Sequence, residues 1–270
     1  MYHVNFLSGG IASWAAGMRV AEKYGTNNLV HLFTDTKKLN DNHPHRGEDE
    51  DLYRFLKESQ TLIGGELEWI SSGKHVWQVF DETRYMGNSR VDPCSRILKR
   101  EEAKAWVTNR YRSDEVVLYM GLDWTEIHRI DKCTKYWYPY KVVFPLTDEP
   151  YLSKEDMIKW VESYGVASPR LYSMGFQHNN CGGFCVKAGM GHFHNLLKQM
   201  PDRYMYHEIK QEELFLVLNK RVPFLRKYIN SKLKYLSLKE FREIVEGEEK
   251  TAIELVDYDD IGGCGCFNDF

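Results

Sequence analysis

Near its N-terminus the chain reads Val4-Asn5-Phe6-Leu7-Ser8-Gly9-Gly10-Ile11-Ala12-Ser13, a short apolar run that meets two glycines between serines. A segment of helical composition follows at once, over residues 12–23. Such a turn presents backbone N–H groups and hydroxyls to an anion, with the positive end of the helix dipole behind it. The stretch therefore predicts either a phosphate-binding loop or an ordinary strand-to-helix turn that needs glycine.

Apolar, strand-like runs alternate with helix-like segments through the first half of the chain. The strand-like runs are His3–Leu7, Leu29–Phe33, Leu67–Ile70 and Val116–Tyr119, and the helix-like segments are Ala12–Lys23 and Glu48–Ser59. This alternation predicts an α/β fold with a doubly wound, mostly parallel sheet. Polar or glycine-containing segments follow three of the strands, starting at Ser8, Thr34 and Gly121. Because ligands bind at the carboxyl ends of parallel strands, we expect these segments to line one rim of the sheet.

The second half of the chain is predicted to be mostly helical. Capping boxes are indicated at Ser153-x-x-Asp156 and Ser237-x-x-Glu240, with proline breaks at Pro201 and Pro223. Helical composition is found over Met157–Tyr164, Asn195–Gln199, Glu208–Leu218 and Phe241–Val245. A boundary near Pro145–Pro150 divides the chain into a predicted α/β domain over 1–150, which contains the possible phosphate-binding loop, and a helical region over 151–270 with a flexible, cysteine-containing tail.

The length, composition and net charge of the chain limit the classes of protein to which it can belong. A chain of 270 residues with 43% hydrophobic content can form a full core. Its net charge of −3 gives no global attraction to nucleic acid, so such a partner requires a local basic patch or another subunit. No apolar run reaches membrane-spanning length, and no secretory signal is found. We therefore expect a cytoplasmic protein without a membrane partner.

Further motifs follow the glycine loop in a fixed order. They are Phe33-Thr34-Asp35-Thr36, the segment from Glu48 to Tyr53, Pro93-Cys94-Ser95-Arg96-Ile97-Leu98-Lys99, the segment from Gly121 to Arg129, and Phe144-Pro145-Leu146. With the loop, this ordered set resembles the PP-loop, or adenine nucleotide alpha hydrolase-like, superfamily. Within that superfamily it is most similar to the phosphoadenosine phosphosulfate (PAPS) reductase-like family. The resemblance covers roughly residues 3–190 and implies a HUP-like fold.

The resemblance assigns roles to individual residues. It implies that an adenine nucleotide is bound by Ser8, Gly9, Gly10, Ile11, Ala12, Ser13, Phe33, Asp35, Thr36 and Gly121. It also implies that Arg96, Lys99 and Arg129 meet the negative charge of the phosphate or leaving group. The residues alone allow another interpretation, in which Arg96 and Lys99 form the solvated face of an amphipathic helix and Asp35 caps a turn.

The chain departs from the family pattern at three places. Ala12 stands where many ATP-using members carry Asp, Leu122 or Asp123 where the reductase branch commonly has Arg, and Ile127 where it has Ser. These differences weaken an assignment to one reaction. The match predicts adenine-nucleotide binding more firmly than any chemistry.

Two close pairs of cysteines form the second group of candidate functional residues. Cys181-Gly182-Gly183-Phe184-Cys185 and Cys264-Gly265-Cys266 bring four thiols into two close pairs, with Cys94 as an alternative ligand. Such a set could hold a [4Fe–4S] cluster or, as the weaker alternative, Zn²⁺. Cys181 and Cys185 could instead have a redox or persulfide-carrying role, or be inert buried thiols. Cys264 or Cys266 could be a nucleophile on a mobile tail. Cys133 stands alone and is expected to be structural.

These observations lead to an enzyme hypothesis with open alternatives. The first reaction is ATP-dependent adenylation with Mg²⁺, releasing AMP and pyrophosphate, coupled to sulfur transfer or to nucleic-acid or nucleobase modification. The second is thiol-dependent reduction of an adenylyl sulfate (APS or PAPS). A non-catalytic nucleotide-binding subunit or sensor is the third, and Ala12 favours it. Expected partners are a nucleic-acid or small-molecule acceptor, a thiol reductant or sulfur-donor protein, and further copies of the chain in a homo-oligomer.

Overall fold

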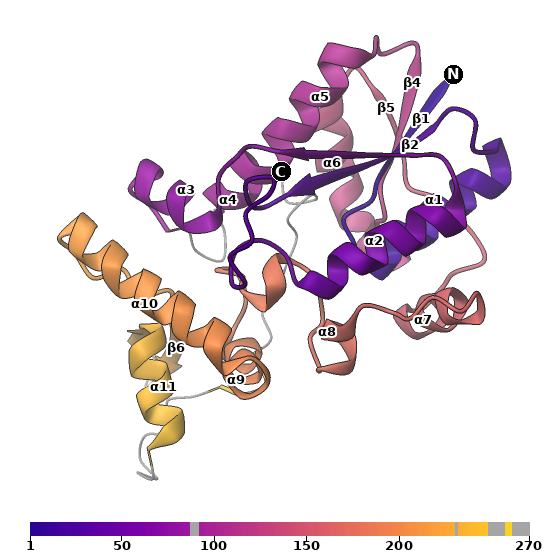
Figure 1. The fold of residues 1–270 in the computed structure, drawn as a ribbon. Coiled ribbons are helices and arrows are strands. Elements are labelled where there is room, and N and C mark those ends of the chain that lie inside the picture. Colours follow the sequence, from indigo (N-terminus) through magenta and orange to yellow (C-terminus); the bar gives the residue numbers. More distant parts are fainter. Residues whose placement is uncertain (87–91, 230–231, 248–256, 261–270) are drawn as a thin grey trace.

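A parallel sheet forms the centre of the molecule (Figure 1). The computed structural model describes residues 1–86, 92–229, 232–247 and 257–260. These residues form a five-stranded sheet of order β3-β2-β1-β4-β5, in which all neighbours run parallel. Its strands are β1 (Tyr2–Phe6), β2 (Leu29–Asp35), β3 (Glu66–Ser71), β4 (Val116–Tyr119) and β5 (Lys141–Val143).

Helices cover both faces of this sheet. α1 (Ile11–Tyr24) and α2 (Glu50–Ile63) cover one face, with α7 (Lys154–Ser163) packed against α1, and α5 (Glu102–Arg110) and α6 (Ile130–Trp137) cover the other face. The chain winds from β1 to β3 in one direction and returns to β4 and β5 in the other. The direction therefore changes between β1 and β4, and ligands of doubly wound sheets bind outside the carboxyl ends of the strands at this point.

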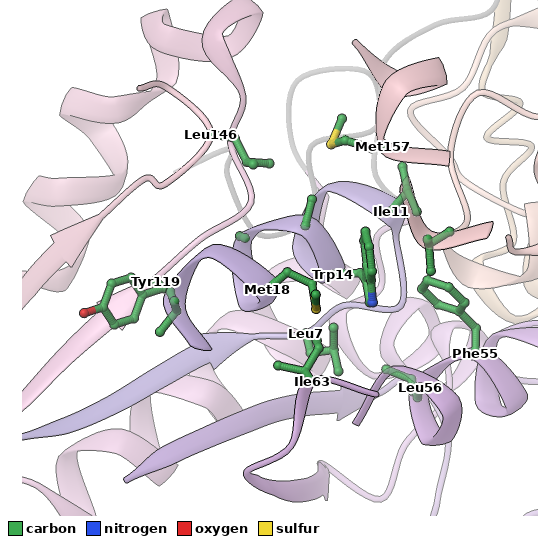
Figure 2. Close-up of a cluster of buried hydrophobic side chains, with 14 of the residues drawn as sticks. Leu7, Ile11, Trp14, Met18, Phe55, Leu56, Ile63, Tyr119, Leu146 and Met157 are labelled. Atoms are coloured by element: carbon green, nitrogen blue, oxygen red, sulfur yellow. The ribbon is translucent and has the colours of Figure 1, made fainter. Parts of the chain in front are cut away.

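Helix α1 supplies the centre of one hydrophobic cluster (Figure 2). Trp14 is fully buried in this cluster, and its ring lies edge-on to that of Trp160 in α7, with ring centroids 5.0 Å apart. Met157 and Val161 of α7 join the same cluster. The cluster thus has members on both sides of Pro145–Pro150.

Shorter helices connect the sheet to the C-terminal part. They are α3 (Val76–Thr83), α4 (Pro93–Ser95), the π-helical turn η1 (Arg96–Glu101), the 3₁₀ turns η2 (Trp124–Arg129) and η3 (Cys181–Gly183), and α8 (Arg170–Ser173). The C-terminal part packs around a second cluster and contains α9 (Met190–Gln199), α10 (Pro201–Leu218), β6 (Leu225–Ile229), β7 (Lys232–Leu236) and α11 (Leu238–Glu246). Among the residues that the structure describes, no helix has the length and apolarity needed to cross a membrane.

The predicted α/β fold is confirmed as a parallel five-stranded sheet with helices on both faces, consistent with a doubly wound topology. Both predicted capping boxes are present, at Ser153 and Ser237. The sequence interpretation missed β5 and the antiparallel pair β6–β7. β5, with three residues, is too short to show a period, whereas the Lys-Leu-Lys-Tyr alternation of β7 is a strand pattern that the helical interpretation of the second half overlooked.

Candidate functional site

A cleft opens where the sheet changes direction, at the carboxyl ends of β1 and β4. It holds about 1220 Å³ of empty space, part of which is open to solvent. Seven of the predicted site residues line it: Ser8, Gly10, Ile11, Ala12, Ser13, Gly121 and Arg129. The first and third polar segments expected at the rim therefore meet in one place.

Glycine and serine residues determine the conformation of the loop between β1 and α1. Gly9 has a φ of +83°, a conformation that side chains with a Cβ rarely adopt, and its carbonyl accepts a hydrogen bond from Asn179 Nδ2 at 2.8 Å. The Ser13 hydroxyl accepts from the Ser8 backbone N–H at 3.1 Å and donates to the Gly10 carbonyl at 2.8 Å. Gly10 caps α1 without a side-chain hydrogen bond. Ile11, Ala12 and Ser13 of the first turn line the cleft, and the N–H groups of a first helical turn suit an anion.

Gly121 allows β4 and α1 to approach closely. A Cβ atom at this position would lie 2.7 Å from the backbone carbon of Ala12 and 2.7 Å from the backbone nitrogen of Ser13. Backbone atoms at that distance cannot yield as a flexible side chain would. The glycine after β4 is thus required by the geometry of the loop that faces it.

Residues 170–180 cover the loop from the far side of the cleft. The Tyr172 hydroxyl accepts a hydrogen bond from the Ile11 backbone N–H at 3.1 Å. Arg170, just before it, forms two hydrogen bonds of 2.7 Å with the buried carboxylate of Asp49 at the start of α2. Lys154 of α7 lies 4.3 Å from the centre of the Tyr172 ring. A helix and a connecting segment from the second half of the chain thereby complete the cleft.

Two cationic side chains line the cleft. Arg129 has a side chain that is 11% exposed and pairs with Glu126, which also lines the cleft. The ammonium of Lys154 donates to the Gln177 carbonyl at 2.6 Å, and burial lowers the pKa of this lysine. Both are placed to balance the charge of an anionic ligand.

A second cavity lies behind residues 179–181 and holds about 450 Å³ of empty space. Asn180 lines the cleft, whereas its neighbour Cys181 lines this cavity. The predicted site residues found here are Thr36, Cys94, Lys99 and Cys181. One short segment, residues 179–181, therefore contributes to the lining of both spaces.

Glu48 organises this second cavity. Its carboxylate is fully buried and pairs with the Lys99 ammonium at 3.0 Å. It also accepts hydrogen bonds from the Thr36 hydroxyl at 3.4 Å and from the Cys181 backbone N–H. Lys99, which the family resemblance directs to a phosphate, is thus engaged by a carboxylate and does not line the cleft.

The Cys181–Cys185 segment adopts an unusual backbone. Cys181, Gly182 and Gly183 all have positive φ, and the buried Arg203 donates to the Gly182 carbonyl at 3.1 Å. Cys181 and Cys185 are both half-buried. Within the described part of the chain, no three His, Cys, Asp or Glu side chains are placed to hold a metal ion. Cys264 and Cys266 lie outside the described residues.

The remaining predicted residues occupy other environments. Phe33 is buried in the core, and the Arg96 side chain is 53% exposed and pairs with Glu101. Asp35 is buried and accepts hydrogen bonds from Tyr53 at 3.0 Å and from Trp69 at 3.1 Å. Burial, with a contribution from the nearby Glu48 charge, raises the pKa of Asp35 to about 6. None of the three lines either space.

Sequence reasoning missed several cleft residues. Tyr172 and Asn179 contact the loop across more than a hundred positions of sequence, and Lys154 reaches it through the packing of α7 on α1. No sequence motif indicated that these three residues belong to the site. Only the polar run before Cys181, which includes Asn179 and Asn180, was a usable signal.

The parallel five-stranded sheet and its cleft are compatible with a Rossmann-like or HUP-like fold. No family model matches the chain, and no curated protein matches it in sequence. The resemblance to a particular family therefore rests on the sequence motifs alone.

Proposed function

We propose that the cleft binds an adenine nucleotide with its phosphates against the loop of residues 8–13. The observation that carries this proposal is the first turn of α1, which receives no cap from its own N-cap residue Gly10 and lines the cleft at the carboxyl ends of β1 and β4. The Ser8 hydroxyl and the cations of Arg129 and Lys154 line the same space. Together these groups supply N–H donors, a hydroxyl and positive charge to a phosphate chain.

The proposed reaction is adenylation of an acceptor by ATP. An acceptor oxygen attacks the α-phosphorus, the bond to the bridging oxygen breaks, and pyrophosphate leaves with its electron pair. Negative charge gathers on the phosphate oxygens during this step, and Arg129 and Lys154 lie where they can stabilise it. Mg²⁺ bound to the nucleotide would neutralise further charge. Sulfur transfer, or modification of a nucleic acid or nucleobase, would follow on the activated acceptor.

A second candidate is thiol-dependent reduction of an adenylyl sulfate. The observation that favours it is the position of Cys181, which is adjacent in sequence to the cleft residue Asn180. A thiolate sulfur would attack the sulfate sulfur, and AMP would leave from APS or adenosine 3′,5′-bisphosphate from PAPS. A second thiolate would then attack the sulfonated cysteine sulfur, forming a disulfide and releasing sulfite. A non-catalytic nucleotide-binding subunit is the third candidate and is favoured by Ala12.

The cysteines fit a metal centre in part. Cys94 and Cys181 line one cavity, and the positive φ angles from Cys181 to Gly183 curve the backbone around it. The described residues do not complete a set of three ligands, so the proposed [4Fe–4S] cluster or Zn²⁺ needs Cys264 or Cys266 as well. Such a cluster would supply electrons or bind a sulfur atom, next to the nucleotide cleft.

A nucleotide panel tests the proposal. The full chain is incubated with ATP and Mg²⁺, APS or PAPS, while binding and the release of pyrophosphate, AMP and sulfite are followed. Arg129→Gln should weaken binding, whereas Arg112→Gln, at an exposed ion pair with Asp114, serves as the matched control. Pyrophosphate release supports adenylation, sulfite release supports the reductase, and binding without turnover supports the subunit. Failure of all three nucleotides to bind would overturn the assignment.

A further inference from the structure

The β6–β7 hairpin concentrates positive charge in an otherwise acidic chain. Residues 219–242 contain eight Lys and Arg residues and one acidic residue, Glu240, although the chain as a whole has a net charge of −3. The hairpin is antiparallel, with Lys227 opposite Lys234 and Arg226 opposite Tyr235. The ladder therefore gathers cations on one short ribbon.

Most of this charge faces solvent. Arg221 pairs with Glu240 at 2.7 Å, and Arg242 pairs with Glu208 of α10 and Glu246 of α11. Among the described residues, no carboxylate forms an ion pair with the exposed side chains of Lys220, Arg226, Lys232, Lys234 and Lys239. These five residues, here called the basic ribbon, are thus available to an anionic partner.

The ribbon is anchored on a rigid base. Leu225 and Phe224 are buried in the second hydrophobic cluster, which α10 and α11 also build. The Leu238 carbonyl, just after the hairpin, accepts a hydrogen bond from Tyr204 at 2.7 Å, and the Leu238 N–H donates to Gln211 at 2.7 Å. The backbone that carries the cations is therefore anchored beside α10 and α11 (Figure 1).

We propose that the basic ribbon binds the phosphodiester backbone of a nucleic acid. A two-stranded β-ribbon fits the major groove of duplex DNA, and lysine and arginine side chains bind phosphates on either side of it. Tyr235 is 51% exposed among these cations and offers a ring on which an unpaired base can stack. The surface lies outside both cavities and needs no nucleotide in the cleft.

The composition of the ribbon argues against a membrane as its partner. Binding to a bilayer surface uses exposed aliphatic and aromatic side chains beside the cations. Among the hairpin side chains that are described, Tyr235 is the one large apolar group that is exposed, and Leu233 and Leu236 are half-buried. The surface therefore suits a polyanion in water.

Binding of the full chain, without nucleotide, to fluorescein-labelled duplex DNA, single-stranded DNA and RNA tests the proposal. Fluorescence anisotropy is measured at increasing NaCl concentration. The double variant Lys232→Gln/Lys234→Gln should lose about tenfold in affinity at low salt, and its slope of log K against log salt should fall by about 2, since two phosphate contacts are removed. Lys232→Arg/Lys234→Arg should retain both affinity and slope.

The matched control is Lys57→Gln/Lys159→Gln, which removes two exposed lysines from α2 and α7. Equal losses in the control, an unchanged slope in the ribbon variant, or binding to anionic phospholipid vesicles in preference to all three nucleic acids would overturn the proposal. Far-UV circular dichroism shows whether each variant is folded, and Lys234→Gln alone replaces the double variant if that one is not. Because no step uses ATP, failure here is distinguishable from failure of the proposed function.

Discussion

The hydroxyl of Tyr172 accepts a hydrogen bond from the backbone N–H of Ile11, at 3.1 Å. The two residues are 161 positions apart, and the bond places α8 over the first turn of α1. An N–H at this position is one that a bound phosphate would use. Tyr172 therefore occupies part of the predicted anion site and connects the second half of the chain to it.

Removal of this hydroxyl should affect the nucleotide-free protein most. Tyr172→Phe leaves the Ile11 N–H without its acceptor and is expected to lower the free energy of unfolding by about 1 kcal/mol. With saturating ATP the loss should shrink, because phosphate oxygens replace the acceptor. Urea unfolding with and without ATP measures both values. Equal destabilisation in the two conditions would contradict a phosphate at this N–H.

Gly121 should tolerate no side chain. Gly121→Ala places a methyl group 2.7 Å from the backbone of Ala12 and Ser13, and this overpacking is expected to cost about 1–3 kcal/mol of stability. Gly10→Ala is the matched control for unfolding, since its Cβ would meet nothing closer than the Tyr172 hydroxyl at 3.5 Å. Thermal or urea unfolding compares the two variants. A Gly121 variant as stable as the Gly10 variant would refute this account of the close approach.

Local sequence patterns predicted the sheet and the loop of residues 8–13, but not which segments of the second half of the chain cover that loop. Val116–Tyr119 was predicted with its observed bounds because four buried apolar residues lie between polar segments. Arg96 and Lys99 lie on one helical turn, yet Arg96 faces solvent while Lys99 is buried against Glu48. The different environments of Arg96 and Lys99 depend on Glu48, which comes from a distant segment. The spacing of residues within the helix therefore cannot predict them. The covering of the loop by Tyr172 is equally non-local.

The Glu48–Lys99 pair should be far more sensitive than a surface pair. Both side chains are at most 3% exposed, so Lys99→Met leaves an uncompensated buried carboxylate and is expected to cost about 3–5 kcal/mol. The exposed pair Arg96–Glu101 is the control, and Arg96→Met should cost less than about 1 kcal/mol. The double variant Glu48→Gln/Lys99→Met should recover part of the loss in urea unfolding. Similar losses of stability in Lys99→Met and Arg96→Met would show that groups other than Lys99 compensate the buried charge of Glu48.

The Cys181–Cys185 segment leads us to a prediction about the metal content of the protein. Anaerobically purified protein should contain iron and absorb visible light, and Cys181→Ser should remove most of both, since Cys181 lines the second cavity with Cys94. Cys133→Ala should leave them unchanged, because Cys133 is buried in the core on the opposite face of the sheet and burial raises its pKa to about 12. Metal analysis and absorbance spectra give the result. Wild-type protein that holds neither iron nor zinc would contradict a metal centre and leave the thiols a redox role.

The buried carboxyl of Asp35 should make stability depend on pH in a defined window. Its pKa is raised from 3.8 to about 6, chiefly by burial, so the folded state holds this proton more tightly than the unfolded state does. Its contribution is therefore most favourable below pH 4, falls as the pH rises from about 4 to 6, and is constant above that range, with a total change on the order of 3 kcal/mol. Asp35→Asn cannot ionise, so the difference in unfolding free energy between wild type and variant should move in the variant's favour over this window. Urea unfolding at a series of pH values measures it, and a difference that stays flat from pH 4 to 7 would show that the carboxyl is ionised throughout.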